Sequence, residues 1–422
     1  MTSARQGSCV IAEKAFSLRA LPGRRGRSQL ARRIAAAAVV VVTAGLGTAC
    51  SPGMPGPAAA GHGIPPVTVL TQGANNGNGD IFIAPMGGGY ASGPEILTNT
   101  GKVVWFHALP PAEYATDFRT QTYRGKPVLT WFQGRGLNGT DYIYNDRYQQ
   151  IAAVRAGNGY LTDFHEFLIT PWNTALILAD AFGTANLTSI GGPASQKVFD
   201  GIVEEIDIRT GKVLFQWNSA DHVPYRDSHL PLPGSAAAPW DWFHINAVHL
   251  DTDGNLLIDS RYTWTTYKVN RHTGKIIWEL GGKQSTFRLH AAPGQDLDSA
   301  GEIFAFQHDP EAIGHDEYTF FDDESNGHTT LLRHSRVVTV RLDLATRVAT
   351  LVKSVSQPEG LVASAEGNAQ TTGNGDLFVG WGALPYISEF SPTGRLLFNA
   401  QLPAGMNTYR AYRLPWHPAS RG

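Results

Sequence analysis

Histidine and asparagine recur in short segments of this sequence that otherwise have the apolar pattern of strands. The segment "DWFHINAV", residues 241–248, holds His244 and Asn246 two positions apart, while His165 lies in "DFHEFLI" and His308 in "FQHDP". A neutral imidazole keeps a lone pair at neutral pH, so a histidine can act as a nucleophile or carry a proton. A single histidine in a strand more often has a structural role. Whether these residues are catalytic therefore depends on whether the fold brings them together.

Two repeated phrases identify the elements that would position these residues. A Thr-Gly turn followed by an alternating apolar strand occurs in "NTGKVVWFHA", "RTGKVLFQWNS", "HTGKIIWELGG" and "PTGRLLFNAQL", which is typical of hairpins whose glycine has positive φ. A second strand precedes each one, as in "NGDIFIAP", "NTALILAD", "DGNLLIDS" and "NGDLFVGW", with weaker copies in "GKPVLTWF" and "DEYTFFDD". Six such units cover residues 66–403, so we predict an all-β protein, a six-bladed β-propeller over residues 66–422.

A further strand precedes these phrases in units two to six, and the first strand of a propeller blade lines the central channel. Its polar side chains at equivalent positions are Arg119, His165, His244, His308 and Asn368. Because positions two apart on a strand share a face, we expect Asn246 to face the channel with His244. His249 is expected to point the other way, into blade packing or onto the surface.

The first 50 residues have the layout of a secretory signal. A basic region precedes a 13-residue apolar run, Ile34 to Leu46, and small residues precede Cys50. The run is shorter than the roughly 20 residues of a membrane-spanning helix. We therefore predict an exported protein with a signal peptide over residues 1–50 and a flexible linker over residues 51–65. Cys50 is a candidate lipidation site of a lipoprotein, so an extracellular protein and one attached to the cell surface both stay open, as does the export route.

Composition excludes several classes of function. Both cysteines, Cys9 and Cys50, lie in this leader, which removes disulfides, thiol catalysis and Cys-ligated zinc from the mature chain. Without the leader, 26 basic and 35 acidic residues remain, a net charge of −9 that argues against nucleic acid as a partner. No metal-binding motif is present and "GGKQS" lacks the pattern of a phosphate loop, so we expect no metal, no cofactor and no nucleotide-type sulfate donor.

The ordered set "DWFHINAV", "IDSRYTW", "FAFQHDP" and "EGNAQ" resembles the bacterial aryl-sulfate sulfotransferases, over nearly the whole mature chain. The resemblance implies a six-bladed propeller with catalytic histidines around its channel. It also implies transfer of a sulfuryl group from a small-molecule aryl sulfate to a phenolic acceptor, independent of the nucleotide donor PAPS. The better-understood members of this family carry an extra β-rich domain before the propeller, and the resemblance does not extend to that domain. Because about 15 residues separate Cys50 from the first repeat, we expect a shorter branch without that N-terminal domain.

The resemblance implies a role for each residue of the site. His308 would be the nucleophile and would carry a sulfohistidine in a ping-pong cycle. Arg261, in "DSRYTW", would bind the sulfate through two parallel hydrogen bonds, His244 and Asn246 would donate to its other oxygens, and His165 would be the general acid or base. The candidate substrate-binding residues are Asn368, Arg119, Trp242, Tyr262, Trp264 and Trp381, although the aromatic ones could instead pack between blades.

Two other functions stay open from the sequence. One is a propeller hydrolase that uses the histidines, with or without a metal, and the other is a non-catalytic propeller that binds a ligand or partner at the cell surface. We expect Asp309 to face away from His308, because adjacent strand residues alternate. The acidic run Asp322-Asp323-Glu324 is expected to be a solvated loop and not a metal site.

Overall fold

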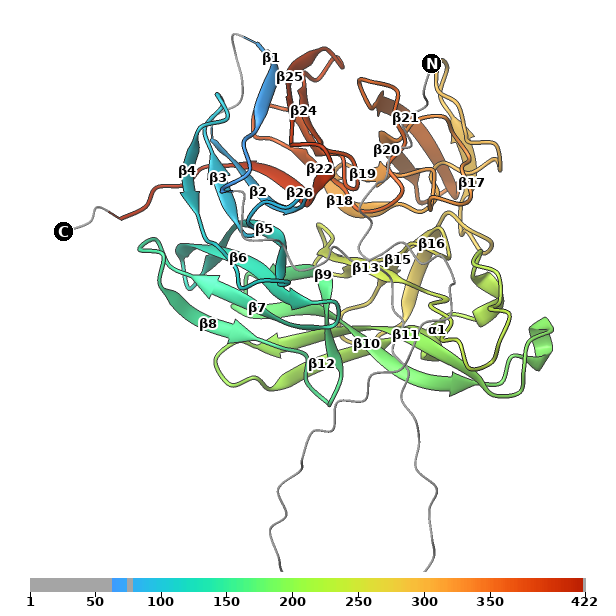
Figure 1. Cartoon of the computed structure of the whole chain (residues 1–422). Helices are drawn as coiled ribbons and strands as arrows, with labels where there is room; N and C mark the ends of the chain where they lie inside the picture. Colours follow the sequence, from blue (N-terminus) through green and yellow to red (C-terminus); the bar gives the residue numbers. More distant parts are fainter. Residues whose placement is uncertain (1–62, 74–78, 420–422) are drawn as a thin grey trace, which may run out of the picture.

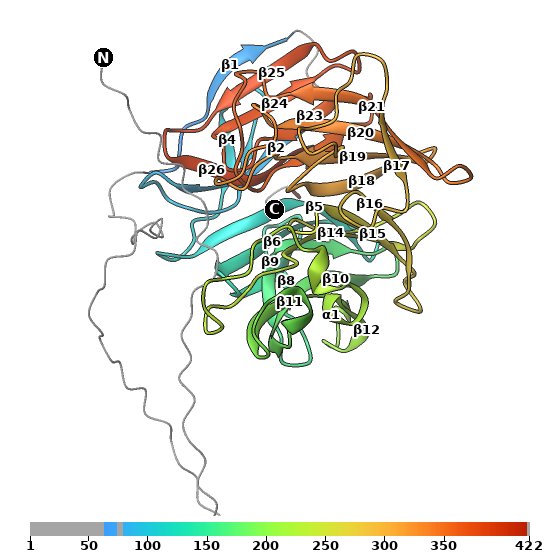
Figure 2. The same cartoon turned by 90° about the vertical axis from the view of Figure 1, so that its right-hand side faces the viewer.

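The computed structural model describes residues 63–73 and 79–419, which form six β-sheets around a central axis (Figures 1 and 2). This confirms the predicted six-bladed β-propeller. The predicted signal peptide, Cys50 and most of the predicted linker lie outside the described residues. Within the described ranges, no helix has the length and apolar character needed to cross a membrane.

Each sheet forms one blade, in which the strands follow one another from the channel outward. The first blade contains β26 (Met406–Leu414), β2 (Asp80–Gly87), β3 (Glu95–Leu97) and β4 (Val103–Phe106). The second contains β5 (Tyr114–Tyr123), β6 (Lys126–Arg135), β7 (Asn138–Tyr144) and β8 (Gln150–Val154). The third contains β9 (Leu161–Ile169), β10 (Thr174–Ala185), β11 (Gln196–Asp207) and β12 (Val213–Asn218).

The other three blades follow the same order. The fourth contains β13 (Ile245–Leu250), β14 (Leu256–Ser260), β15 (Thr265–Val269) and β16 (Ile276–Leu280). The fifth contains β18 (His308–Gly314), β19 (Glu317–Asp322), β20 (Arg336–Asp343), β21 (Val348–Ser356) and the parallel outer strand β17 (Arg288–Ala291). The sixth contains β22 (Asn368–Thr371), β23 (Leu377–Gly380), β24 (Tyr386–Phe390), β25 (Leu396–Gln401) and the outer strand β1 (Thr68–Gln72). Short helical turns, η1 (Thr188–Ile190), α1 (Ser219–His222) and η2 (Tyr225–Asp227), lie in connections of the third and fourth blades.

The repeated Thr-Gly phrases form the turn between the third and fourth strands of four blades. Their glycines, Gly101, Gly211, Gly274 and Gly394, have φ between 70° and 82°, a region that other residues rarely adopt. The second repeated phrase forms the buried second strand of every blade, as in β10 and β14. Apolar side chains of adjacent blades then pack into shared clusters, so the core is a ring of inter-blade layers.

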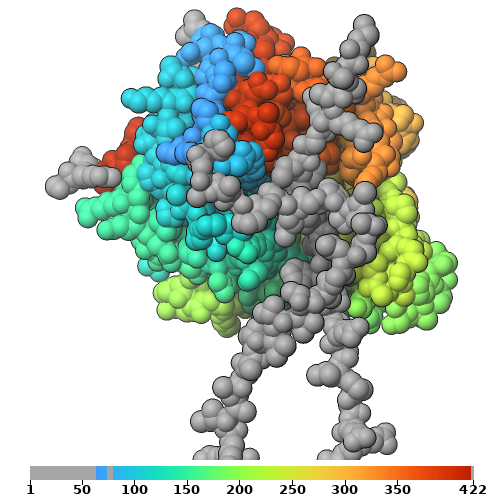
Figure 3. All heavy atoms as spheres, viewed as in Figure 1, coloured from blue at the N-terminus to red at the C-terminus, as the bar shows by residue number. Residues whose placement is uncertain are grey.

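The ring closes by strands from both ends of the chain. The C-terminal strand β26 is the innermost strand of the first blade, and β1 is the outermost strand of the last blade. The surface view shows this closure, because residues near the N-terminus, in blue, lie directly against the last blade, in red (Figure 3). The inner strands consequently form a closed circle in which each contacts the next: β26, β5, β9, β13, β18 and β22.

The amide of Asn368 joins the last blade to the closing strand. Its Nδ2 donates to the backbone oxygen of Ala411 at 2.8 Å, and its Oδ1 accepts from the backbone N–H of Ala411, also at 2.8 Å. The side chain is fully buried. This amide therefore substitutes for a backbone pairing between β22 and β26, and its predicted role in binding substrate stays a prediction.

Five of the six inner strands contain a register shift against their second strand. In β9, residues 163–166 lie between the pairs Thr162–Ala179 and Phe167–Ile177. In β5 and β18 the interrupted residues include Asp117 and Asp309, whose φ values are 49° and 53°. Such bulges re-aim side chains and break the simple alternation of a strand. The bulges therefore decide which polar side chains enter the channel.

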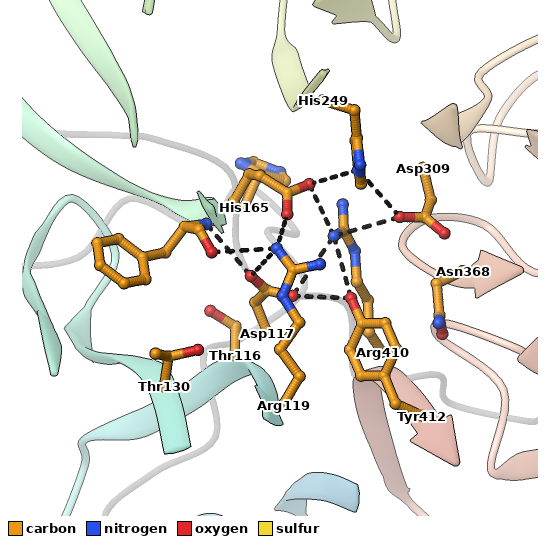
Figure 4. A network of polar contacts seen from close by, with 12 residues as sticks. Thr116, Asp117, Arg119, Thr130, His165, His249, Asp309, Asn368, Arg410 and Tyr412 are labelled. Atoms are coloured by element: carbon orange, nitrogen blue, oxygen red, sulfur yellow. Dashed lines mark hydrogen bonds and ion pairs between the residues drawn. The ribbon is translucent and has the colours of Figure 1, made fainter. Parts of the chain in front are cut away.

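A buried ion network fills part of the channel (Figure 4). Arg410 of β26 lies at its centre, with its Nη1 2.7 Å from Glu166, 3.3 Å from Asp309 and 3.4 Å from Asp117. Arg119 pairs with Asp117 at 3.1 Å and also with Glu166. Burial opposes ionisation of Glu166, but Arg410, His249 and Arg119 together hold its pKa below the ordinary value. These groups come from five blades, so the network holds the blades together across the axis.

His249 supplies the third positive charge of this network. Its Nε2 lies 3.1 Å from Glu166 and 3.4 Å from Asp309. Burial lowers the pKa of His249, but Glu166 and Asp309 outweigh it and raise the pKa to about 10. The expectation that His249 points into blade packing or onto the surface was therefore wrong, because the bulge at the start of β13 changes which side chains face the axis. The network contains three carboxylates and three cations, so its charge is balanced.

Removing the Asn368 amide should destabilise the ring closure. In Asn368→Ala, the backbone N–H and oxygen of Ala411 lose their partners while still buried, which costs about 2–4 kcal/mol for two such groups. We expect the free energy of unfolding, measured by urea denaturation, to fall by this amount. The matched control is Asn138→Ala, at an exposed strand end, which should change it by less than about 0.5 kcal/mol. An Asn368→Ala protein as stable as the wild type would show that the amide does not close the ring.

His249 should make stability depend on pH in the alkaline range. Its pKa in the folded protein, about 10, lies above its ordinary value of 6.5. The stabilisation is therefore complete below pH 6.5 and is lost as the pH rises through 10. Compared with His249→Gln, the wild type should be more stable at pH 6.5 by up to roughly 5 kcal/mol, and this advantage should shrink toward pH 10.

The exposed His272 provides the control for this titration, since His272→Gln should leave the pH dependence of the wild type unchanged. The measurement is denaturant unfolding of the three proteins at several pH values. A constant gap between wild type and His249→Gln from pH 6.5 to 10 would contradict the ion-pair assignment.

Candidate active site

The structure brings three of the predicted histidines together at the channel. The rings of His165, in β9, and His244, just before β13, have centroids 5.1 Å apart in an edge-to-face arrangement. His308, at the start of β18, lies near enough that the charges of His165 and His244 act on it. All three side chains are buried, with no more than 4% of their surface exposed. The three rings therefore form one cluster contributed by three consecutive blades.

Each histidine of this cluster has its Nδ1 against an aspartate. The distances from Nδ1 are 2.5 Å from His165 to Asp163, 2.6 Å from His244 to Asp241 and 2.6 Å from His308 to Asp323. A carboxylate next to Nδ1 accepts a hydrogen bond from the ring N–H and thereby selects the tautomer with a lone pair on Nε2. The same pairing thus orients three imidazoles through residues at three different sequence separations.

His308 is kept neutral by its surroundings. Burial lowers its pKa well below the ordinary value, and the positive charge of Arg261 lowers it further. The charges of His165, His244 and Arg410 act in the same direction. A neutral imidazole retains a lone pair, so His308 is in the protonation state that a nitrogen nucleophile requires.

Arg261 follows β14 and lies beside the histidines. Its backbone N–H donates to the backbone oxygen of His244 at 3.1 Å, and its guanidinium lies 5.2 Å from the ring centre of Tyr262 and 5.9 Å from that of Phe306. One Nη donates to the backbone oxygen of Ser364 and the other to the Tyr262 hydroxyl at 3.1 Å. These contacts hold a fully charged group within the cluster, where an anion would bind.

The predicted aromatic residues divide into two groups. Tyr262 and Trp264 pack with Phe306 into a small apolar cluster beside Arg261, and the Tyr262 ring lies 5.1 Å from that of His244. Trp242 and Trp381 are instead completely buried in blade cores. Their indole N–H groups donate to protein oxygens, which indicates packing. The structure thus places Tyr262 and Trp264 at the site and the other two tryptophans away from it, in the packing role that the sequence had left open.

Asn246 lies in the bulge of β13, where the alternation expected from its spacing to His244 breaks down. His244 itself has a φ of 51°, and the pairing with β14 skips from Ile245 to Ala247. The Asn246 side chain is completely buried, and its Nδ2 donates to the backbone oxygen of Gln307 at 2.7 Å. The amide thus links the fourth and fifth blades next to His308. Its predicted donation to sulfate oxygens stays a prediction.

Two other predicted residues lie in the channel but apart from this cluster. Arg119 belongs to the ion network, where it pairs with Asp117 and Glu166 and donates to the backbone oxygen of Phe167 at 3.0 Å. Asn368 bonds the backbone of Ala411. The five aligned polar positions therefore do send their side chains to one channel. Only the three histidines among them form the cluster.

The acidic run Asp322-Asp323-Glu324 corrects an expectation from the sequence. All three side chains are completely buried, so the predicted solvated loop was wrong. Arg336 pairs with Asp322 and Glu324, each at 2.9 Å, while Asp323 bonds His308. The run follows β19 of the same blade as His308, and an acidic run alone carries no sign of burial. Asp309 was expected on the opposite face of the strand, but it lies at a bulge with a φ of 53° and also enters the channel, where it joins the ion network.

The sequence reasoning missed other residues around the channel. Arg410 and Tyr409 lie on β26, which follows the last repeat and supplies the inner strand that the first unit lacks. Tyr409 is completely buried with its ring centre 5.6 Å from that of His165, and its hydroxyl has no hydrogen-bond partner among the described residues. The missing first strand of unit one was the available signal for this closure. The repeated "TDF" of residues 116–118 and 162–164 was a signal for Asp117 and Asp163.

The site combines a neutral nucleophile with an environment suited to an anion. His308 has Arg261 nearby, and two more histidines with oriented rings can donate or accept protons. An apolar wall of Tyr262, Trp264 and Phe306 lies beside the guanidinium. Such a set can bind a flat group that carries a negatively charged end and can transfer that end to nitrogen.

Comparisons with known proteins identify a family. No match was found among curated proteins. Similar solved structures include a protein of unknown function from Bacteroides caccae (11% identity, TM-score 0.47, 79% of this chain and 98% of that chain). They also include the periplasmic gluconolactonase PpgL of Pseudomonas aeruginosa (12%, TM-score 0.40, 80% and 99%) and virginiamycin B lyase of Staphylococcus aureus (9%, TM-score 0.36, 79% and 87%). At these TM-scores and identities they support no inference about function.

A family model gives the more informative match. Residues 119–402, about two thirds of the chain, match the arylsulfotransferase (ASST) family. The matched range begins at Arg119 in β5 and ends after β25, so it includes the three clustered histidines and Arg261. The fold, the clustered residues and this match lead to one conclusion: the chain belongs to the arylsulfotransferase family.

Proposed function

We propose that this protein transfers a sulfuryl group from an aryl sulfate ester to a phenolic acceptor, with His308 as the nucleophile and without PAPS. The observation that carries the proposal is the buried, neutral His308 within reach of the charges of Arg261 and of two further histidines. Membership of the arylsulfotransferase family supports aryl donors and acceptors.

The charges around His308 favour an anionic ligand over a metal ion. Among the described residues, Glu166, His249 and Asp309 form a group that could hold a cation, since their ligand atoms lie within 4.8 Å of one another. Arg410 already places a positive charge 2.7 Å from Glu166 and 3.3 Å from Asp309. At the histidine cluster, Arg261 would repel a metal ion and attract a sulfate. This arrangement supports sulfuryl transfer more than metal-dependent hydrolysis.

In the first half-reaction, the Nε2 lone pair of His308 attacks the sulfur atom of the aryl sulfate. The bond between sulfur and the aryl oxygen breaks, and the electron pair goes to that oxygen. Arg261 holds the sulfate oxygens, while His165, protonated on both ring nitrogens at this step, gives its Nε2 proton to the leaving oxygen. His165 is then neutral, with its Nδ1–H still bonded to Asp163 and a lone pair on Nε2. The products are a free phenol and an SO₃ group on Nε2 of His308.

In the second half-reaction, the acceptor phenol attacks the same sulfur atom. Its oxygen gives up a proton to the base that protonated the first phenol, and the N–S bond breaks with its electron pair returning to Nε2. An unperturbed phenol has a pKa near 10, so a base is needed at neutral pH. The aromatic wall of Tyr262, Trp264 and Phe306 gives the two phenols in turn a flat surface against which to pack.

We also propose that the protein acts outside the cytoplasm. The basic and apolar pattern of residues 1–50 supports export, and Cys50 is the position at which a lipid would attach the chain to the cell surface. Membrane attachment would then depend on this lipid alone. These residues lie outside the described part of the chain, so the support comes from the sequence pattern.

The nucleophile can be tested with para-nitrophenyl sulfate as donor and phenol as acceptor. His308→Ala should lower the rate of transfer at least about 1,000-fold, because no other group forms the N–S bond. The exposed His290 gives the control His290→Ala, which should keep full activity. Wild-type protein mixed with donor alone should carry one SO₃ group on the peptide that contains His308, detected by mass spectrometry.

Each outcome of this experiment has a clear meaning. Release of para-nitrophenol that rises with phenol concentration supports transfer to the acceptor. Release of para-nitrophenol at a rate that does not depend on the phenol concentration would instead indicate a hydrolase. No release from any aryl sulfate tried would favour a binding protein. Full transfer activity in His308→Ala would rule out His308 as the nucleophile.

Arg261→Lys tests the sulfate-binding role separately from the nucleophile. Lysine keeps the positive charge but loses the planar pair of donors, so we expect kcat/KM for para-nitrophenyl sulfate to fall by roughly 100-fold. Arg147→Lys, at an exposed turn of the second blade, is the matched control and should retain wild-type kinetics. An unchanged kcat/KM in Arg261→Lys would show that the guanidinium does not hold the transferred group.

A further inference from the structure

Asp323 and His308 form a buried pair, and the proposed transfer steps give Asp323 no role. The Oδ2 atom of Asp323 lies 2.6 Å from Nδ1 of His308, and the exposed surface of the two side chains is 0% and 1%. Asp323 follows directly after β19, the strand that pairs with β18, and its backbone oxygen accepts from the Ser335 hydroxyl at 2.7 Å. Its position is therefore held by the blade and not by solvent.

The state of this pair decides which nitrogen of His308 can react. An ionised Asp323 accepts a hydrogen bond from Nδ1–H and leaves the lone pair on Nε2. A protonated Asp323 would donate to Nδ1 and leave the ring proton on Nε2, where it would block attack on sulfur. Burial favours the second state and raises the pKa of Asp323, whereas the Arg261 charge opposes this. Other acidic groups, Asp322, Glu366 and Asp259, act in the same direction as burial.

We propose that Asp323 is an ionised positioning residue that holds His308 as the Nδ1–H tautomer, presents Nε2 to the sulfate ester and offsets the positive charge formed on the ring. The proposal rests on the function proposed above. When Nε2 bonds to sulfur, the ring becomes cationic while its Nδ1 proton stays in the hydrogen bond to Asp323. The negative charge of Asp323 is then next to the cation, and the pair returns to its first state when the N–S bond breaks.

The two neighbouring pairs give the proposal its internal comparison. Asp163 and Asp241 contact Nδ1 of His165 and His244 in the same way, although they precede their histidines by two and three residues. Asp323, in contrast, follows His308 by 15 residues and reaches it across a strand pair. Three local solutions that all place a carboxylate at Nδ1 indicate that the orientation of the rings is the feature which the site requires.

The decisive variant is Asp323→Asn, because asparagine keeps the shape of a protonated aspartate. Its amide N–H would donate to Nδ1 and force the proton onto Nε2. We expect kcat for transfer from para-nitrophenyl sulfate to phenol to fall at least roughly 100-fold, with KM changed less than about threefold. The rate of the variant should also rise steadily with pH, unlike that of the wild type, since removing the Nε2 proton restores the nucleophile.

Asp316→Asn, an exposed position in the same blade, is the control and should behave as the wild type. Thermal unfolding of each variant separates a loss of folding from a loss of catalysis. Nitrogen-15 chemical shifts of the His308 ring in full-length protein report the tautomer without any substrate. We expect the proton on Nδ1 in the wild type and on Nε2 in Asp323→Asn.

These measurements separate the inference from the proposed reaction. If the wild type transferred no sulfate but its shifts showed Nδ1–H, the reaction would be wrong and the positioning role would stand. A wild-type ring protonated on Nε2 would overturn the inference, and so would wild-type kcat in a folded Asp323→Asn protein. A folding-deficient Asp323→Asn would be replaced by Asp323→Glu, which keeps the carboxylate and should retain more activity than Asp323→Ala.

Discussion

The architecture of the channel depends on burying opposite charges in equal number around Arg410. An isolated buried carboxylate would carry a large desolvation penalty, so Asp117, Glu166 and Asp309 are tolerated only because Arg410, Arg119 and His249 lie among them. Ala369 of the sixth blade also donates its backbone N–H to Asp309 at 2.9 Å, so every blade contributes to this network. Closure of the ring therefore brings together a polar group from each of the six blades, five side-chain sets and one backbone N–H. This arrangement sets the register of each inner strand next to the histidines.

The bulges allow one inner strand to supply residues to both the ion network and the histidine cluster. A regular inner strand sends alternate residues to the channel, so adjacent residues could not both serve it. In β9, the interrupted residues 163–166 include Asp163 and His165 at the cluster and Glu166 in the ion network. In β18, His308 faces the cluster while Asp309, at a φ of 53°, turns into the network. Left-handed backbone at non-glycine residues costs energy, and its concentration at these strand starts is typical of functional sites.

The repeats made the fold predictable, because six copies of a strand pair with a Thr-Gly turn leave few alternatives to a propeller. The histidines were predictable for the same reason, as alignment of the copies superimposes His165, His244 and His308. The register of each inner strand was not, since nothing in "DWFHINAV" signals that a left-handed His244 precedes the strand. This is why His249 and Asn246 were assigned to faces by an alternation that the strand does not keep. The closing strand was also missed, because Arg410 follows the last recognisable repeat and joins the first blade only in three dimensions.

The separation of two electrostatic environments explains how a neutral histidine can persist in so charged a channel. In the ion network, carboxylates surround His249 and raise its pKa to about 10. At the cluster, burial keeps the pKa of His308 low, and the positive charges of Arg261, His165, His244 and Arg410 lower it further. The same residue type, one blade apart, is therefore charged in one place and neutral in the other. The protein obtains this difference from the bulges, which direct Glu166 and Asp309 toward His249 and away from His308. A strand without its bulge would mix the two environments and protonate the nitrogen that the proposed reaction needs free.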